Sequence, residues 1–132
     1  MSAAARGLRA ERPSAPRVAM AYRNLNVLDA AERAAQQLNE LIDRSPPRRL
    51  LRVSQMRESM QSTAANISEG FGRGTGGRDR ARPLEIARGE AEETIRHLNA
   101  NFRTNRIDAT DYWSLRNLLV VIGRMLNSLL NI

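Results

Sequence analysis

Apolar side chains recur along most of the chain at alternating steps of three and four residues, with polar and charged residues between them. This spacing places side chains on one face of an α-helix. Four such stretches follow one another, and none of the chain shows the alternation of period two that is typical of a half-buried β-strand. The pattern predicts an all-α protein with four helices.

The second stretch carries the clearest apolar stripe, made of Val53, Met56, Met60, Ala64, Ile67 and Phe71. We expect its helix to begin near Arg48 and to end at Gly70, because glycine takes a left-handed C-terminal cap without a steric penalty. Beside the stripe lie small polar residues that would let a neighbouring helix come close: Ser59, Ser62, Thr63 and Asn66.

The first helix is predicted from about Ala19 to Arg44, since the residue before a proline is pushed away from α geometry and Pro46 follows. The third helix should begin between Asp79 and Pro83. Gly89 lies inside it and costs about 1 kcal/mol relative to alanine. Close packing against a neighbour would offset that cost.

Asp108 is a suitable N-cap for the fourth helix, and Asp111 is favourable in its first turn. This helix is apolar on more than one face, and one side of a small bundle would leave such residues exposed. We therefore expect an interface between copies of the chain at Leu119, Val120, Val121, Leu126 and Leu130.

Two of the three connections between the helices are short, which favours antiparallel neighbours and an up-down-up-down four-helix bundle. We assign this bundle domain to residues 18–132. Residues 1–17 are rich in alanine, arginine and proline and have no periodicity, so we expect a disordered basic tail.

The 132 residues suit one domain, and the net charge is +7 with arginine as the only basic residue type apart from one histidine. Arginine binds phosphate through two parallel hydrogen bonds, although a codon bias toward arginine is the stronger explanation of the missing lysine. Aromatic residues are few, so we expect no platform for stacking bases, and the phosphate backbone should supply most of any nucleic-acid affinity.

In the predicted topology the tail and the connection 71–82 lie at one end of the bundle, and each contributes a net charge of +3. The opposite end holds Arg103 and Arg106 beside the first connection, and the positive charge there is partly balanced by Asp43, Asp108 and Asp111. The candidate contacts to RNA or DNA are arginines of the two regions: Arg48, Arg49, Arg52, Arg57, Arg73, Arg78, Arg80 and Arg82. Solvated loop arginines that keep the protein soluble are an equally good interpretation.

Other chemistry has little support. Cysteine is absent, and the single His97, which we expect at the surface, lacks the second Glu-x-x-His motif of a bundle metal site, so no metal or cofactor is expected. No base is placed to activate a serine, so we do not expect an enzyme. The glycines of 72–77 match a nucleotide-binding motif by letter, but no strand precedes them. No apolar run is long enough to span a membrane and no secretory signal is present, so a cytoplasmic protein is expected.

Residues 66–73 read NISEGFGR and resemble the N-I-A-E-G-x-G-R signature of bacterial four-helix bundle proteins encoded in intervening sequences of large-subunit ribosomal RNA genes. Residues 84–89 are similar to the L-x-x-A-x-G segment of the same family, although Ser68 and Glu90 depart from its pattern. The resemblance covers roughly residues 20–132. Its signature residues here are Asn66, Glu69, Gly70, Gly72 and Gly89. We expect Asn66 to hydrogen-bond a neighbouring helix or chain and Glu69 to pair with Arg73.

The resemblance implies a homopentameric ring without a settled activity. A related branch, the accessory variability determinant of diversity-generating retroelements, is a basic ring that binds a reverse transcriptase and its RNA. The leading hypothesis is thus a non-catalytic oligomeric accessory protein that binds RNA or DNA and, in the second branch, a reverse transcriptase. The alternative is a ring-shaped protein-interaction scaffold with no nucleic-acid role. The resemblance does not decide between the two branches.

Overall fold

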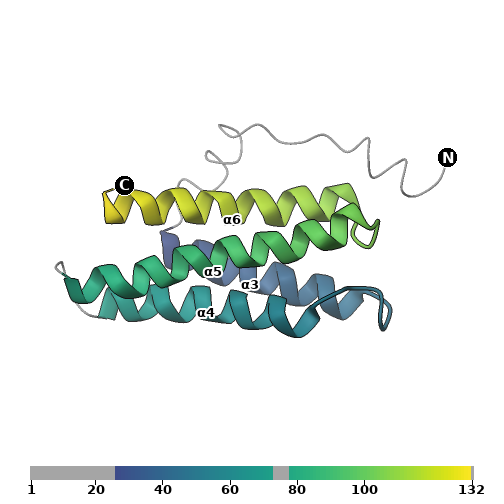
Figure 1. Cartoon of the computed structure of the whole chain (residues 1–132), viewed down its shortest axis with the longest axis horizontal. Helices are drawn as coiled ribbons and strands as arrows, with labels where there is room; N and C mark the ends of the chain where they lie inside the picture. Colours follow the sequence, from purple (N-terminus) through teal and green to yellow (C-terminus); the bar gives the residue numbers. More distant parts are fainter. Residues whose placement is uncertain (1–25, 73–77, 132) are drawn as a thin grey trace.

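The computed structural model describes residues 26–72 and 78–131. This part of the chain contains four α-helices and no strand: α3 (Val27–Arg44), α4 (Val53–Gly72), α5 (Arg78–Arg103) and α6 (Ala109–Leu130). Consecutive helices run in opposite directions side by side (Figure 1). The predicted all-α fold with four helices is confirmed. The expected basic tail at 1–17 lies outside the described residues.

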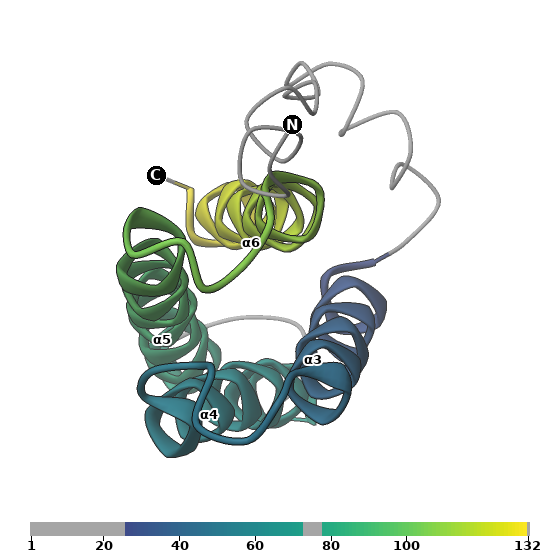
Figure 2. The ribbon, with the colours of Figure 1, turned by 90° about the vertical axis from the view of Figure 1, so that its right-hand side faces the viewer.

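Viewed along the helix axes, the four helices surround one core (Figure 2). Each helix contacts the next in the chain, α6 also contacts α3, and the α4–α5 contact is the most extensive. All four helices bury large side chains completely, among them Leu38, Met60, Leu98 and Ile122. The bundle therefore has one continuous hydrophobic core to which every helix contributes.

Side chains that cap helices fix the start of α3 and of α6. Asn26 accepts a hydrogen bond from the Asp29 amide at 2.8 Å, and Asp108 accepts one from the Asp111 amide at the same distance. The predicted N-cap of the fourth helix is confirmed. The predicted start of the first helix near Ala19 is wrong, because Asn26 has extended backbone geometry and the helix begins after it.

The predicted ends of the second helix are also wrong. α4 begins at Val53 rather than near Arg48, and it continues past Gly70 to Gly72. Gly70 is thus a helical residue and not a left-handed cap. A Cβ built on it would lie 2.7 Å from Leu84 Cδ2, so this glycine permits the close approach of α4 and α5. The third helix begins at Arg78, with Pro83 inside it.

Most of the apolar side chains of α6 are buried against the other helices of the same chain. Leu119, Val121 and Leu126 are buried in the core, and Val120 and Leu130 are half-buried. The first three therefore lie in the protomer core rather than at a free surface. None of the four described helices is both long and apolar enough to cross a membrane.

Candidate nucleic-acid interface

The connections 45–52 and 104–108 meet at one end of the bundle, on the right in Figure 1. The Arg49 guanidinium donates to the Asn105 carbonyl oxygen at 3.0 Å, and the Arg106 guanidinium donates to the Arg49 carbonyl oxygen at 2.9 Å. Two arginines far apart in the sequence thereby join the two loops. We call the surface formed by Arg48, Arg49, Arg52, Arg103 and Arg106 the arginine end.

A buried asparagine holds the first of these loops in place. Asn101 Oδ1 accepts from the Leu51 amide at 2.7 Å, and Asn101 Nδ2 donates to the Leu51 carbonyl oxygen at 3.1 Å. The side-chain amide therefore satisfies both backbone groups of Leu51, as a neighbouring strand would. Asn101 is fully buried, so its hydrogen bonds are shielded from water and tie the loop to the core.

Two residues of the arginine end have left-handed backbone conformations, with φ of 65° at Arg48 and 59° at Arg52. A left-handed conformation costs a non-glycine residue about 1–2 kcal/mol. The hydrogen bonds of Arg49 and Leu51, which lie between them, hold the loop in this shape. The backbone that presents Arg48 and Arg52 is thus strained and fixed by contacts outside the loop.

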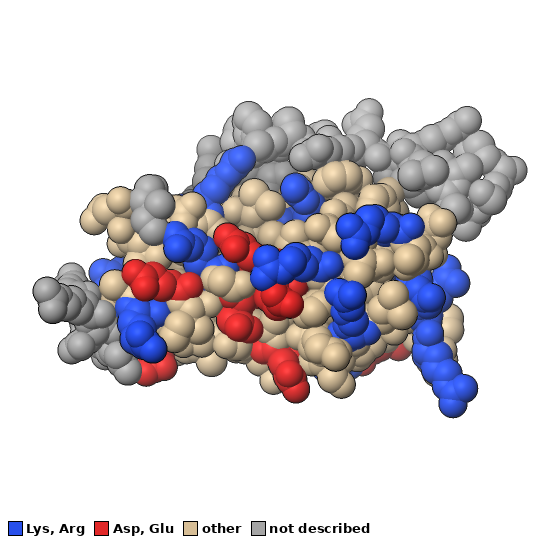
Figure 3. All heavy atoms as spheres, viewed as in Figure 1, with Lys and Arg blue, Asp and Glu red and all other residues tan. Residues whose placement is uncertain are grey.

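The arginine end carries positive charge that no carboxylate neutralises by contact. Arg48, Arg49, Arg52 and Arg103 are exposed, Arg106 is half-buried, and none of the five forms an ion pair with the described part of the chain. In the space-filling view arginines are spread along the whole face, but the acidic residues lie mostly in the middle and toward the other end, so the arginines at this end have little acidic surface beside them (Figure 3). In addition, α4 starts here without an acidic residue in its first turn, unlike α3 and α6.

The structure does not bring all the candidate arginines together. Arg57 lies 3.4 Å from Asp43, and Arg80 is half-buried with its guanidinium 5.7 Å from the centre of the Phe71 ring. Arg80 and Arg82 belong to the start of α5, which lies beside the end of α4. The arginine end lies beside the start of α4, and this helix is about 30 Å long. Arg73 and the Arg78 side chain lie outside the described residues. The eight candidates therefore cannot form one continuous site.

Arg103 and Arg106 were missed as candidate contacts. Their signal was present in the predicted topology, because an antiparallel bundle places the third connection beside the first. The specific link between Arg106 and Arg49 depends on the loop conformations and has no sequence signal of its own.

The signature residues lie on α4 and α5 in varied roles. Asn66 Nδ2 donates to the Ser62 carbonyl oxygen at 2.8 Å, within its own helix, and the expected bond from Asn66 to a neighbouring helix or chain stays a prediction. Glu69 lies in the last turn of α4, and its expected partner Arg73 is outside the described residues. Gly89 is exposed, and a Cβ there would meet nothing within 4 Å. The close packing expected at Gly89 is absent from the described chain.

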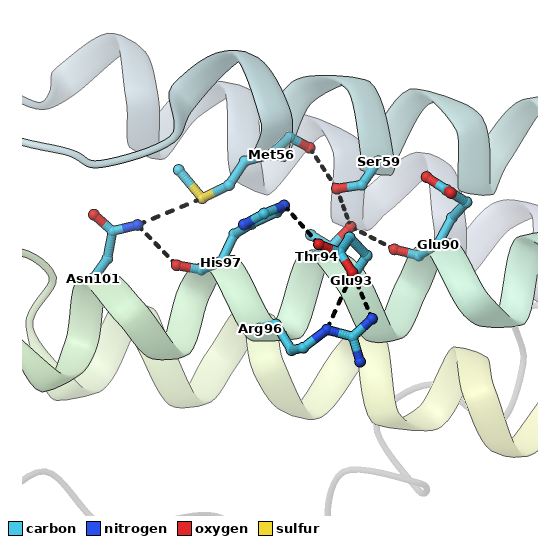
Figure 4. A network of polar contacts seen from close by, with 8 residues as sticks. All are labelled: Met56, Ser59, Glu90, Glu93, Thr94, Arg96, His97 and Asn101. Atoms are coloured by element: carbon cyan, nitrogen blue, oxygen red, sulfur yellow. Dashed lines mark hydrogen bonds and ion pairs between the residues drawn. The ribbon is translucent and has the colours of Figure 1, made fainter.

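A polar seam lines the contact between α4 and α5 (Figure 4). The hydroxyls of Ser59 and Thr94 are buried and 2.7 Å apart, and His97 Nε2 lies 3.3 Å from the Glu93 carboxylate. His97 is only 7% exposed, so its expected place at the surface is wrong. Within the described residues, no three metal-ligating side chains are grouped to hold an ion.

Glu93 links this seam electrostatically to the arginine end. The hydrogen bond from Arg96, with Nε at 3.1 Å, holds the pKa of Glu93 below its ordinary value, and the positive charges of Arg96, His97 and Arg52 act in the same direction. The carboxylate in turn raises the pKa of Arg96. Arg52 thus feels the charge of Glu93 without forming an ion pair with it.

Comparisons with known proteins agree with the four-helix architecture. A family model described as 23S rRNA-intervening sequence protein matches residues 23–128. A crystal structure of a protein of unknown function from the S23 ribosomal protein family of Bacteroides thetaiotaomicron is 26% identical in sequence, with a TM-score of 0.70. The match covers 80% of this chain and 99% of that one. No curated protein matches the chain.

Proposed function

The chain belongs to the 23S rRNA-intervening sequence protein family, and from this premise we propose that it is a non-catalytic accessory protein that binds the phosphate backbone of RNA or DNA through its arginine end. The observation that carries the proposal is a set of five arginines, four on two joined loops and Arg103 at the adjoining end of α5, none of which forms an ion pair with the described residues. Arginine is the residue best suited to bidentate contact with phosphate.

Three features of the arginine end favour phosphate binding over a solvated loop. The backbone of the first loop is fixed from the core by Asn101, so binding needs to order only side chains and not the loop itself. The left-handed conformations of Arg48 and Arg52 are retained despite their cost, as is typical of functional segments. The start of α4 adds a partial positive charge at the same place.

A salt titration of RNA and DNA binding tests the proposal. If the five arginines each neutralise one phosphate, affinity should fall on the order of 10²- to 10³-fold between 50 and 200 mM salt. Absence of binding to any nucleic acid at low salt would contradict the proposal.

A triple variant locates the contact. Replacing Arg48, Arg52 and Arg103 by glutamine should abolish most binding. The slope of log affinity against log salt concentration should become shallower by the equivalent of about three phosphate contacts. The matched control replaces Arg33, Arg82 and Arg124, which are exposed elsewhere on the bundle, and should lose much less. Equal losses in the two triple variants would mean that net charge alone, and not the arginine end, binds the nucleic acid.

The proposal includes assembly into a ring-shaped homo-oligomer, for which the resemblance implies a pentamer. Support comes from the exposed apolar residues Ile86 and Leu129, which are 42% and 39% exposed in the single chain. Light scattering during size-exclusion chromatography should give five times the protomer mass of 14.8 kDa. A monomeric mass would contradict the ring.

A protein partner is the second part of the proposal. The retroelement branch of the resemblance supplies a reverse transcriptase as this partner. The net charge of +7 is similar to that branch, whereas the motif at residues 66–70 is closer to the intervening-sequence branch. Copurification of such an enzyme that survives nuclease treatment would support a protein contact. Retention of the enzyme by the arginine-end triple variant, with RNA binding lost, would place the protein contact outside the arginine end, whereas retention of the enzyme by a parent protein that binds no RNA would favour the scaffold alternative.

A further inference from the structure

A hollow that opens to solvent lies between α3 and α6, and we call it the α3–α6 hollow. Its volume is about 170 Å³. Leu41 and Leu115, which are almost fully buried, form its apolar part. Since a cavity of about 150 Å³ in another protein binds benzene, the α3–α6 hollow has room for one flat ring system.

The α3–α6 hollow adjoins the arginine end. Arg44, the last residue of α3, lines it and shortly precedes Arg48 in the chain. Asp111, in the first turn of α6, also lines it and shortly follows Arg106. The side chains of Arg44 and Asp111 form an ion pair that joins the two helices. A ligand in the hollow is therefore close to any phosphate bound at the arginine end.

The polar side chains that line the α3–α6 hollow have unused hydrogen-bonding capacity within the described part of the chain. Glu40 Oε1 accepts from Gln36 Nε2 at 3.2 Å, whereas Glu40 Oε2 has no such partner there. The side chains of Gln37 and Ser114 form no hydrogen bond with the described residues either. Arg44 has N–H groups beyond the one in its ion pair. The hollow thus offers a carboxylate as acceptor together with several donors.

Guanine is the nucleobase that matches this set of groups. A carboxylate can accept two parallel hydrogen bonds from donors that lie side by side. The Watson–Crick edge of guanine presents such a pair, N1–H and the N2 amino group, with the acceptor O6 beside them. Uracil and thymine present a single N–H between two carbonyl oxygens, which a carboxylate repels.

A guanidinium or ammonium group also suits a carboxylate, but the surrounding charge disfavours a cation in the α3–α6 hollow. Arg44 lines the hollow, and the five arginines of the arginine end adjoin it. These positive charges repel a cationic ligand. A guanine nucleotide instead brings a neutral base to Glu40 and a phosphate to the arginines, so its charge suits both parts of the surface.

We propose that the α3–α6 hollow binds an unpaired guanine of the nucleic acid held at the arginine end. Glu40 accepts from N1 and N2 of the base, and Gln37 and Arg44 donate to O6. The inference rests on the proposed function, to which it adds a preference for one base. A guanine within a duplex uses the same edge to pair with cytosine, so the hollow selects single strands.

Fluorescence anisotropy of labelled single strands at low salt tests the preference. An oligouridylate with one central guanosine should bind about 5- to 150-fold more tightly than the plain oligouridylate, the range for one bidentate contact to a base. Inosine at the same position lacks the N2 amino group and should remove most of this increase. The same comparison in oligothymidylate with one deoxyguanosine shows whether the hollow also accepts guanine from DNA.

A variant of the carboxylate locates the preference. Glu40→Gln should lose the increase due to guanosine and bind the plain oligouridylate at least as well as the parent protein, because a glutamine presents only one acceptor. The matched control is Glu32→Gln, which removes another exposed carboxylate of α3 and should keep the preference. Both side chains are exposed, so both variants should fold as the parent does. Equal loss of the preference in the two variants would contradict a role of Glu40.

The outcomes separate this inference from the proposed function. Absence of binding to any nucleic acid overturns both. Salt-dependent binding that is equal with and without guanosine overturns the guanine site and leaves the arginine end standing. In an NMR titration, guanosine monophosphate should shift the amide signals of Ser114 and Leu115 more than uridine monophosphate does. Shifts caused by agmatine, a guanidinium compound, and not by guanosine monophosphate would overturn the guanine site in favour of a cation site.

Discussion

Gly70 on α4 lies directly against Leu84 on α5. A Cβ built at Gly70 would be 2.7 Å from Leu84 Cδ2 and 2.9 Å from Leu84 Cγ. Leu84 is fully buried, so a rotation away from an added Cβ would have to take place inside the packed core. The missing side chain at Gly70 is what allows the two helices to approach closely near the end of α4.

Replacing Gly70 by alanine should therefore lower the free energy of unfolding. Overpacking of a close contact costs about 1–3 kcal/mol, which exceeds the gain of roughly 1 kcal/mol from the better helix propensity of alanine. Urea denaturation followed by circular dichroism measures the change. A variant as stable as the parent would mean that α4 and α5 can move apart at no cost.

Gly89→Ala is the matched comparison, and its effect on the free energy of unfolding should be opposite to that of Gly70→Ala. Gly89 is in the middle of α5 and exposed, and its added Cβ would meet nothing within 4 Å. The free energy of unfolding should rise by about 0.5–1 kcal/mol through helix propensity alone. If the variant instead loses stability or assembles less well, another copy of the chain occupies the space beside Gly89, and light scattering would detect the change in mass.

The fold was largely predictable because helical periodicity is a local property. Each apolar stripe identified its helix, and Asp108 could be recognised as a cap from its position alone. The errors at the start of α4 have a non-local cause. The loop 45–52 is held by Asn101, which lies 50 residues away from Leu51 in the sequence. Nothing in the local sequence indicates that Arg48 and Arg52 should have left-handed backbones, since arginine has no preference for them.

The candidate interface was predictable only in part, for the same reason. The abundance of arginine near the first connection was visible in the sequence. The hydrogen bond from Arg106 to Arg49 was not, because it depends on how the two loops pack against each other. The ring of Phe102 on α5 contacts the ring of Trp113 on α6, and this contact depends on the turn between the two helices. His97 has a polar sequence neighbourhood and yet is buried, because its helix packs so closely against α4.

Arg48→Gly and Arg48→Ala should separate stability from binding. Both variants lose the same positive charge, so both should weaken nucleic-acid binding to a similar extent at low salt. Glycine relieves the left-handed conformation at φ 65°, whereas alanine does not. The glycine variant should therefore be more stable than the alanine variant by about 1 kcal/mol in urea denaturation. Equal stabilities would show that the loop relaxes and that no strain is stored at Arg48.

Glu93 should give the protein an acid-dependent stability. Its pKa is lowered chiefly by the hydrogen bond from Arg96, so the folded state binds this proton less tightly than the unfolded chain does. The resulting stabilisation is fully present above the ordinary pKa of a glutamate, near 4.5, and is lost as the pH falls through the lowered value in the folded state. The free energy of unfolding should therefore decline between about pH 5 and about pH 3. In Glu93→Gln the free energy of unfolding should decline less over this range, because glutamine does not titrate. The control is Glu58→Gln, which removes an exposed carboxylate on the other helix, α4, and its stability should follow that of the parent protein. Identical declines in the parent and in Glu93→Gln would show that the contact between Arg96 and Glu93 does not stabilise the fold.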